Sequence, residues 1–497
     1  MEITRRDALK MASSAAIVGG PSAATAHDAT AKAVPQGADL EFDLGIPTPD
    51  TVEKLYDTMD FQRAVQGYLW AVPIVGMEGA RRMLVDNAEA RSGDLVLVAG
   101  YRDVSVMLGS NVTTPYVFAW FDLTEGPIVI DYPEGATAGS LIDWWDRPLI
   151  DVGVSGPDGG KGAKFVVVGP AHEAPENPPA GAKLLRSRTN KVLMFCRGLD
   201  SDLKKVEAVF SKTQVYPLGA TGNGVTALLR FKTEGQLTSM AHPKGLAYWQ
   251  SLIQALDGEQ IEDRDRFFAA MLKPLGVTYG GSFSPNDRQT ELLDNAANLG
   301  EAMAKASAFS KRIPGMRYRE DTHWEYLIPQ DFVNEQDGPD GTLLDQRTAF
   351  FYEVTGTSAA VLTKTPGTGS AYLTAYSDPD GHAFDGAKSY RLRVPANVPA
   401  KTFWSITLYD TETRSLIQNK QQIVDRSSRQ KLKVQDDGSI EIVMGPQTPE
   451  GLEQNWIPTT PGKAWFVYFR LFGPLEPYFD KSWRLPDIEK AIYTNPH

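Results

Sequence analysis

The stretch Phe403 to Asp410, which reads FWSITLYD, decides the fold class of this chain. Apolar and polar-tipped residues alternate from Trp404 to Tyr409, and this period of two is typical of a strand buried on one face. Similar alternation recurs at 389–394, 439–444 and 464–471. We predict that these segments are strands of one antiparallel sheet system, with FWSITLYD near its centre.

The bulk composition limits the class of protein. A chain of 497 residues is too long for one hydrophobic core, which predicts several domains. The formal net charge is −12, and no Lys- and Arg-rich run interleaves with aromatic residues, so we expect no nucleic-acid partner. The only cysteine, Cys196, lies in an apolar strand-like run, so no intramolecular disulfide can form and we interpret it as a buried small side chain.

The amino terminus has the layout of an export signal. Arg5 and Arg6 precede a moderately apolar stretch from Met11 to Gly20, and small residues follow at 24–26. Paired arginines in this position predict a twin-arginine signal peptide over residues 1–26 and a periplasmic or secreted location. We expect residues 27–49 to be mobile. The rest of the chain has no segment long and apolar enough to span a bilayer.

The sequence pattern of the mature chain changes twice, from strand-like to helical and back to strand-like. Short alternating runs over 50–200 predict a first β-sandwich domain, and those over 325–475 predict a second. Residues 201–324 are mainly helical in pattern, with Trp249, Leu252 and Leu256 at helical spacing, and 476–497 form a C-terminal tail. An earlier helical pattern is expected to end or kink at Pro73. The predicted fold class is therefore mainly β, a β-rich α+β protein.

Few chemical motifs are complete in this sequence. The six histidines have no i, i+4 pair and there is no CxxC, which excludes the common zinc signatures. His323 and Glu325 are two apart and form a weak ligand pair, with a solvated strand edge as the alternative. Asp378, Asp380 and Asp385 concentrate carboxylates in one turn, which suits a hard cation or an ordinary hairpin. A divalent metal ion is therefore one option for a cofactor, and no other is indicated.

The motifs resemble a two-domain bacterial family built from two domains of unknown function, DUF1254 followed by DUF1214. The first domain is represented by AVQGYLWAVPIVGM at 64–77, FDLTEGPIVIDYP at 121–133 and KFVVVGP at 164–170. The second is represented by SDPDGHAFDGAKSYRL at 377–392, FWSITLYD, DDGSIEIVM at 436–444 and NWIPTTPGKAWFVYFRLFGP at 455–474. The resemblance implies two jelly-roll-like sandwiches with helices between them, often exported and often oligomeric, and it supplies no reaction.

One motif departs from the family pattern. Members tend to carry Asn-x-Asp-Thr-x-Tyr in the first domain, whereas this chain has Asn111-Val112-Thr113-Thr114-Pro115-Tyr116. The missing carboxylate puts an acid–base or metal role at this position in doubt.

Polar-tipped aromatics, arginines and amides in these motifs and strands are the candidate site residues, because they suit a cleft between two sandwiches. The candidate catalytic charges are Asp122 and Arg470, since both lie in apolar strands where an unpaired charge is costly. The candidate substrate-binding residues are Tyr68, Trp70, Asn111, Tyr116, Arg197, Arg347, Trp404, Tyr409, Asn455 and Trp456. The alternative is that the tryptophans are core and that Arg470 pairs with a buried carboxylate.

Two classes of function fit this sequence. The first is an exported enzyme, most simply a hydrolase that acts on a small or medium polar molecule in an interdomain cleft, with a metal-bound water as one route. The second is a non-enzymatic ligand-binding or assembly module. We also expect a homo-oligomer with residues 471–493 among its contacts, because Phe472, Tyr478 and Trp483 are too apolar for a free tail. The alternative is that this tail packs on its own domain.

Overall fold

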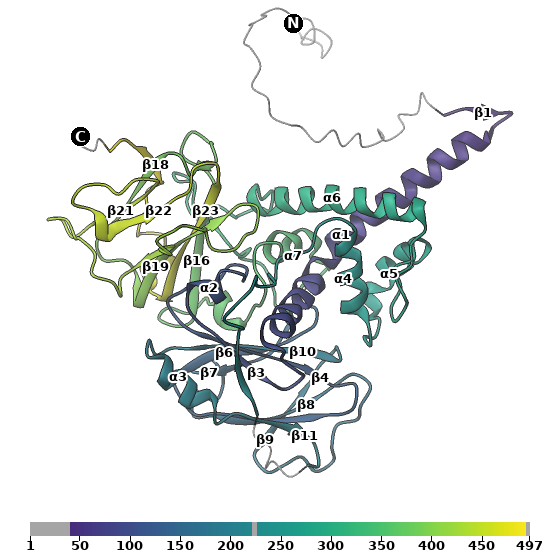
Figure 1. Ribbon diagram of the computed structural model, residues 1–497, viewed down its shortest axis with the longest axis horizontal. Helices are drawn as coiled ribbons and strands as arrows, with labels where there is room; N and C mark the ends of the chain where they lie inside the picture. The colour runs from purple at the N-terminus through teal and green to yellow at the C-terminus, as the bar shows by residue number, and fades with distance from the viewer. Residues whose placement is uncertain (1–39, 221–225, 494–497) are drawn as a thin grey trace, which may run out of the picture. The chain divides into compact units, whose positions relative to one another are not determined.

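The computed structural model describes residues 40–220 and 226–493 (Figure 1). The predicted signal peptide and most of the predicted mobile segment lie outside the described residues. None of the helices among the described residues combines the length and the hydrophobicity that a membrane span needs. The chain divides into two units, Met1–Leu55 and Tyr56–His497.

The described part of the first unit is a short hairpin and the start of a helix. Strands β1 (Phe42–Asp43) and β2 (Ile46–Pro47) pair antiparallel around Leu44 and Gly45, which have positive φ angles of 50° and 85°. Helix α1 (Pro49–Ala88) then begins with a proline at its first position, where the missing N–H costs no hydrogen bond.

Two stacked sheets make the first sandwich. The six-stranded sheet has the order β12 (Leu228–Arg230), β3 (Leu95–Val98), β4 (Tyr116–Asp122), β10 (Lys191–Gly198), β6 (Thr137–Asp143) and β7 (Pro148–Gly153). The four-stranded sheet has the order β11 (Gln214–Pro217), β5 (Ile128–Tyr132), β8 (Ala163–Val168) and β9 (Ala182–Arg186). Neighbouring strands are antiparallel except for the β12–β3 and β8–β9 pairs.

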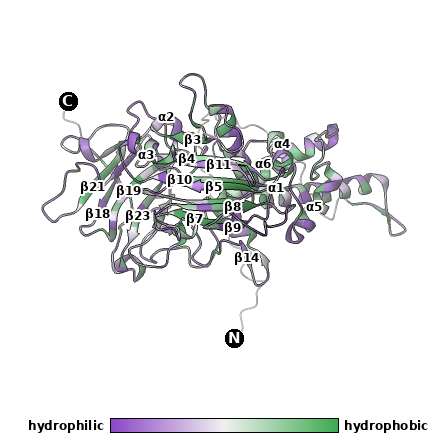
Figure 2. Cartoon of the chain, turned by 90° about the horizontal axis from the view of Figure 1, so that it is seen from below, coloured by the Kyte–Doolittle hydropathy of each residue, from purple (hydrophilic) through white to green (hydrophobic). Residues whose placement is uncertain are grey.

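Alternation along β4 explains how the first sandwich meets the rest of the unit. Val117, Ala119 and Phe121 belong to the core that the two sheets share, which also contains β5 and β8 residues such as Ile130 and Phe165. Strands β5 and β8 are coloured mainly hydrophobic in Figure 2. Tyr116 and Phe118 point the other way and join a larger core with the helices and the second sandwich.

The second sandwich contains the stretch FWSITLYD. One of its sheets has the order β13 (Glu325–Tyr326), β16 (Ser370–Ala375), β23 (Ala464–Pro474), β19 (Ala400–Asp410) and β20 (Asp425–Ser427), and β17 (Phe384–Asp385) also pairs with β23. The facing sheet has the order β22 (Trp456–Pro458), β21 (Ile440–Gly445), β18 (Ser389–Val394) and β24 (Glu489–Ala491). FWSITLYD is the C-terminal part of β19, beside the central strand β23.

Two details of the strand prediction are corrected. The four predicted strands divide between both sheets: β19 and β23 lie in one, and β18 and β21 lie in the other. In addition, every residue from Phe403 to Asp410 is buried, not only one face. Part of the second face lies against the first domain, where the Tyr409 hydroxyl donates to the Ser110 carbonyl oxygen.

Helix α1 continues through Pro73, so of the two outcomes expected from the sequence, an end or a kink, the end is wrong. Proline has no N–H and so leaves the Leu69 carbonyl oxygen without its helical donor. The Thr348 hydroxyl lies 3.4 Å from that oxygen. Nearby carbonyl oxygens of the same turn also accept from side chains: Tyr68 from Tyr248 at 2.8 Å, Trp70 from Arg347 at 3.2 Å and Val72 from His242 at 2.8 Å. Side-chain donors therefore surround the proline turn.

The predicted helical segment between the sandwiches contains α3 (Leu203–Phe210), α4 (Leu246–Leu256), α5 (Arg266–Leu272) and α6 (Asp287–Phe309). A capping box formed by Asn286 and Gln289 starts α6. Gly300 lets α6 lie directly on α1, because a Cβ there would approach the Tyr68 ring to 2.5 Å. Short helices α2 (Tyr101–Val104), α7 (Leu344–Phe351) and α8 (Glu476–Phe479) complete the set among the described residues.

The apolar residues of the C-terminal tail pack on their own chain. Tyr478, Trp483 and Ile488 are buried, and the Tyr318 hydroxyl donates to the Tyr478 carbonyl oxygen at 2.9 Å. Strand β24 then adds to the edge of β18. The tail therefore needs no second subunit to cover these side chains.

Candidate functional site

Five of the residues predicted from the sequence lie where the two sandwiches touch, namely Asn111, Tyr116, Arg197, Tyr409 and Arg470. Arg470, on β23, is fully buried, and its Nη2 donates to the Gly109 carbonyl oxygen and to the Tyr409 hydroxyl, both at 2.6 Å. The Tyr409 hydroxyl in turn donates to the Ser110 carbonyl oxygen. Burial raises the pKa of Tyr409 to about 12, with Arg470 opposing the rise. Two side chains of the second domain thus hold the 109–110 turn of the first.

The family motif that departs from its pattern continues this turn. The Asn111 backbone N–H donates to the Tyr116 hydroxyl at 2.9 Å, and the Asn111 side-chain oxygen accepts from the Thr113 N–H at 3.0 Å. The Thr113 hydroxyl donates to Asp425 at 3.3 Å. Asp425, a buried carboxylate of the second domain, therefore lies beside Thr113, the position at which the family motif has an aspartate.

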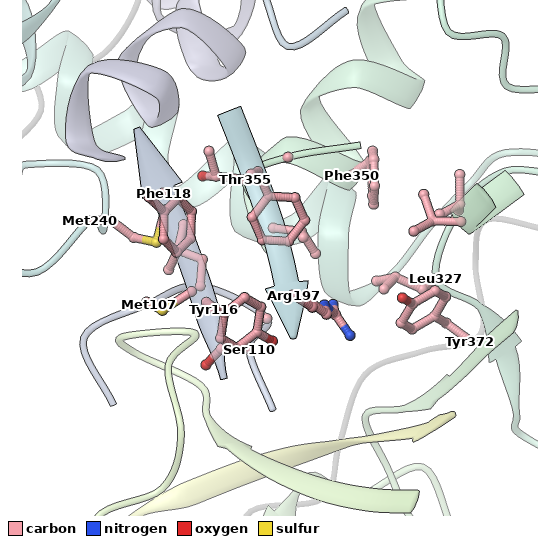
Figure 3. A pocket seen from close by; sticks show the side chains of 17 residues that line it. Met107, Ser110, Tyr116, Phe118, Arg197, Met240, Leu327, Phe350, Thr355 and Tyr372 are labelled. Carbon is pink, nitrogen blue, oxygen red and sulfur yellow. The ribbon is translucent and has the colours of Figure 1, made fainter. Parts of the chain in front are cut away.

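A small pocket lies against these residues (Figure 3). Its cavity of about 40 Å³ is enough for about three water molecules at 10–15 Å³ each. The wall is mainly aromatic and aliphatic, and it comes from both domains and from α7 and the residues after it. The lining includes Met107, Ser110, Tyr116, Phe118, Phe195, Arg197, Met240, Leu327, Phe350, Thr355 and Tyr372.

Arg197 is the only charged side chain among the described residues of this wall. Its guanidinium lies over the Tyr116 ring, 5.0 Å from the centroid, and 5.8 Å from the Phe195 centroid. In the described part of the chain, neither Arg197 nor Arg470 has a carboxylate within ion-pair distance. The Arg197 guanidinium therefore gives the pocket wall an excess of positive charge.

A buried aspartate, Asp146, fixes the position of one residue of the pocket wall. The Asp146 carboxylate accepts from the Gly356 N–H at 2.8 Å, and Gly356 lines the pocket. Gly356 has a positive φ of 94°, which a side chain would oppose. Burial raises the pKa of Asp146 to about 7, with a further contribution from Asp143. The carboxyl group therefore keeps its proton over most of the acid range.

This shift predicts how stability depends on pH. The folded pKa of Asp146 is raised above its unfolded value, so stability falls as pH rises from about 4 to 7 and then levels off. At about 1.4 kcal/mol for each pKa unit, Asp146→Asn should stabilise the protein by roughly 4 kcal/mol more at pH 8 than at pH 4. Denaturant unfolding at both pH values, with the exposed Asp122→Asn as control, measures this difference. Equal pH dependence in Asp146→Asn and wild type would contradict it.

A buried charged network lies behind Tyr409. Glu353 is fully buried and accepts from the Tyr376 and Tyr468 hydroxyls, both at 2.7 Å. Lys311 Nζ lies 3.6 Å from Glu353 and donates to the Tyr376 hydroxyl at 2.6 Å. Burial raises the pKa of Glu353, and Lys311 opposes this. Sequence reasoning missed this network, although a charge directly after the aromatic run 350–352 was a usable signal.

The remaining predicted binding residues lie in the core or in turns, outside the pocket wall. Tyr68 stacks on Tyr248, Trp70 donates to Asp265 at 2.8 Å, and Arg347 lies over Trp145. Burial lowers the pKa of Arg347 to about 9.

In the second domain, the other predicted binding residues have similar roles. Trp404 stacks on Phe469, and Trp456 donates to the Gly445 carbonyl oxygen at 2.8 Å. Asn455 bonds the backbone of Lys433 in both directions.

Asp122, the predicted catalytic carboxylate, is not part of the pocket wall. It lies exposed at the end of β4, and its side chain accepts from the Thr124 N–H at 2.9 Å. This contact is a local turn cap. The structure therefore does not bring Asp122 together with Arg470.

At both candidate metal sites, a lysine ammonium of the protein lies close to the carboxylates. Asp378, Asp380 and His382 are the group of three ligand-type side chains that the described residues bring together. Lys490 Nζ lies 2.9 Å from Asp378 and 3.0 Å from Asp380, so one ammonium already offsets part of their negative charge. Asp385 caps its own turn by accepting from the Ala387 N–H at 2.9 Å.

His323 and Glu325, the second option, have other partners as well. His323 Nδ1 lies 2.8 Å from Asp487, and Lys311 Nζ lies 3.7 Å from Glu325.

Comparisons with known structures concern the fold. A crystal structure of a Vibrio parahaemolyticus protein has a TM-score of 0.52 and 16% identity, and the match covers 87% of this chain and 100% of that one. An uncharacterised Burkholderia cenocepacia protein has a TM-score of 0.39 and 13% identity, with 88% and 97% covered. The first likeness shows a shared β-rich α+β fold. No curated protein matches the sequence.

Family models match both halves of the chain. Residues 97–217 match the family described as "Protein of unknown function (DUF1254)", and residues 369–476 match "Protein of unknown function (DUF1214)". The pocket lies where these two regions meet, since its wall includes Tyr116 of the first and Tyr372 of the second. The chain therefore carries a DUF1254 domain followed by a DUF1214 domain, in the order that its motifs predicted.

Proposed function

We propose that the protein binds a small organic anion, a carboxylate of a few heavy atoms, in the pocket between the two domains. The observation that carries this proposal is the Arg197 guanidinium, which lines an aromatic pocket without a carboxylate partner among the described residues. A guanidinium presents a planar fork of donors that matches a carboxylate. The aromatic and aliphatic wall suits the apolar body of the ligand.

Binding fits this pocket better than hydrolysis. None of the described residues of the wall is a histidine, cysteine, aspartate or glutamate. The wall therefore offers no general base or activated nucleophile of the usual kinds. The size of the cavity favours a short ligand, because a larger one would have to displace Phe118, Phe195 or Phe350.

Thermal stabilisation by carboxylates tests the proposal. In a phosphate-free, carboxylate-free buffer, acetate or propionate at a large excess over Kd should raise the unfolding midpoint by at least about 2 °C, because a ligand that binds only the folded state stabilises it. Arg197→Met should abolish this rise, since it removes the cation and keeps the apolar stem. Arg266→Met, at an exposed arginine, is the matched control. Equal rises in wild type and Arg197→Met, or no rise in wild type, would reject the proposal.

Export and assembly belong to the same proposal. We propose that the protein is exported by the twin-arginine route and binds its ligand in the periplasm as a homo-oligomer. The paired arginines at 5 and 6 support the route. Replacing both with lysine should retain the protein in the cytoplasmic fraction, and light scattering on the mature chain measures the assembly.

A further inference from the structure

A second cavity lies apart from the Arg197 pocket. Its volume is about 420 Å³, within the range of small-molecule sites. It is formed by the segment between α6 and β13 and by the residues after β16. Unlike the first pocket, it is lined by titratable side chains, namely Lys311, Arg317, Glu320, His323, Glu325 and Tyr376.

His323 is held in one orientation by Asp487. The carboxylate lies 2.8 Å from His323 Nδ1 through one oxygen and accepts from the His323 backbone N–H at 2.6 Å through the other. A carboxylate partner places the proton on Nδ1 and leaves the Nε2 lone pair available. Nε2 has no hydrogen-bond partner among the described residues. The His323 side chain is 32% exposed and the Asp487 side chain 17%, so water reaches the ring while the aspartate stays sheltered.

A fixed cation faces the same cavity. The Lys311 side chain has no exposed surface, and its ammonium donates to the Ala308 carbonyl oxygen and the Tyr376 hydroxyl, both at 2.6 Å. Glu325 Oε2 lies 3.7 Å from Lys311 and is buried without a hydrogen-bond donor. Burial raises the pKa of Glu325, while Lys311 opposes this. The cavity thus combines an oriented base, a cation and an acceptor that lacks a donor.

We propose that this cavity is a hydrolytic site for a small polar ester, with His323 as general base and water as nucleophile. His323 Nε2 takes a proton from water, and the water oxygen bonds to the ester carbonyl carbon. The carbonyl oxygen becomes an oxyanion, whose charge the buried Lys311 ammonium beneath the cavity wall offsets without direct contact. When the carbon–oxygen ester bond breaks, the imidazolium returns its proton to the leaving alkoxide, so the products are an acid and an alcohol and the base is restored.

Water, rather than a protein hydroxyl, is assigned as the nucleophile. Ser310 and Ser377 line the cavity, and neither has a hydrogen bond to His323 among the described contacts. This site is independent of carboxylate binding at Arg197, because no lining residue is shared.

Hydrolysis of p-nitrophenyl acetate and mono-p-nitrophenyl succinate tests the proposal. The full-length protein should hydrolyse at least one probe faster than buffer, and His323→Asn should lower the enzymatic rate by about 10²–10⁴-fold, the usual contribution of a general base. His382→Asn is the matched control, since that side chain is 70% exposed outside the cavity. The unfolding midpoint of each variant shows whether it is folded, and His323→Gln replaces His323→Asn if the latter is not.

Asp487 acts through His323 and is a positioning residue. Asp487→Asn should lower kcat by at least about tenfold with little change in KM, because the substrate touches the imidazole and not the carboxylate. Nitrogen NMR of the His323 ring should show the proton on Nδ1 in the wild type and a mixture of tautomers in Asp487→Asn. Asp487→Glu should restore part of kcat.

Three results would overturn the proposal. One is a wild-type rate equal to buffer with both esters. Another is a His323→Asn rate equal to that of His382→Asn. The third is a wild-type His323 ring with its proton on Nε2. Arg197→Met should lose the thermal stabilisation by carboxylates and should leave all three of these readouts unchanged. A failure of ester hydrolysis can therefore be distinguished from a failure of anion binding.

Discussion

Glu353→Ala should lower the free energy of unfolding by about 3–5 kcal/mol, the usual cost of removing one member of a buried ion pair. The carboxylate is fully buried and accepts from Tyr376 and Tyr468. Its loss leaves Lys311 Nζ without its nearest carboxylate and the Tyr468 hydroxyl without an acceptor. Denaturant unfolding monitored by tryptophan fluorescence measures the change.

Two further variants show whether the charge or the hydrogen bonds matter. Glu353→Gln keeps the shape and one acceptor oxygen, so we expect a smaller loss than for Glu353→Ala. Glu291→Ala, at an exposed position of α6, should change stability by no more than about 0.5 kcal/mol. A loss below 1 kcal/mol in Glu353→Ala would mean that the network contributes little.

Arg470→Ala should lower the free energy of unfolding by about 3 kcal/mol and loosen the contact between the two domains. The guanidinium is the donor to the Gly109 carbonyl oxygen and to the Tyr409 hydroxyl, both at 2.6 Å. Once it is removed, that carbonyl oxygen loses the side-chain donor that ties it to the second domain. Hydrogen exchange should rise at residues 108–116 before it rises in the cores of the sandwiches.

Arg266→Ala separates this effect from the general loss of an arginine. Its side chain is 75% exposed and pairs only with an exposed aspartate. We expect wild-type hydrogen exchange at residues 108–116 in this control. Faster exchange in Arg470→Ala spread evenly over both sandwiches would argue against a local clamp.

The strands could be predicted from period-two alternation, but their partners could not. Alternation identified β19 and β18 equally well, because it depends only on which faces are buried. It carries no information on which strand lies beside which, so both were placed in one sheet system. For a related reason the sequence did not show whether α1 ends at Pro73: the side chains that contact this turn, Thr348 and Arg347, lie 270 or more positions away.

The site residues that could be predicted are polar residues that lie in otherwise apolar strands. Arg470 and Tyr409 stood out as polar groups in apolar strands, and both are at the domain contact. The same criterion also selected Trp404, which is core, because a sequence does not show whether a ring faces a cavity or another ring. His323 was noticed for its spacing to Glu325, but its partner Asp487 is 164 positions away and gave no local signal.

The side-chain donors around Pro73 also affect the order in which the protein can fold during synthesis. The carbonyl oxygens at 68–72 accept from Tyr248, His242, Arg347 and Thr348. When the ribosome has made only α1 and the first sandwich, none of these donors exists, and that turn of the helix must remain hydrated. Such long sequence separations slow folding because a large loop closes before any contact forms. The nascent chain therefore cannot complete the side-chain contacts of this turn until some 275 further residues, from Pro73 to Thr348, have emerged.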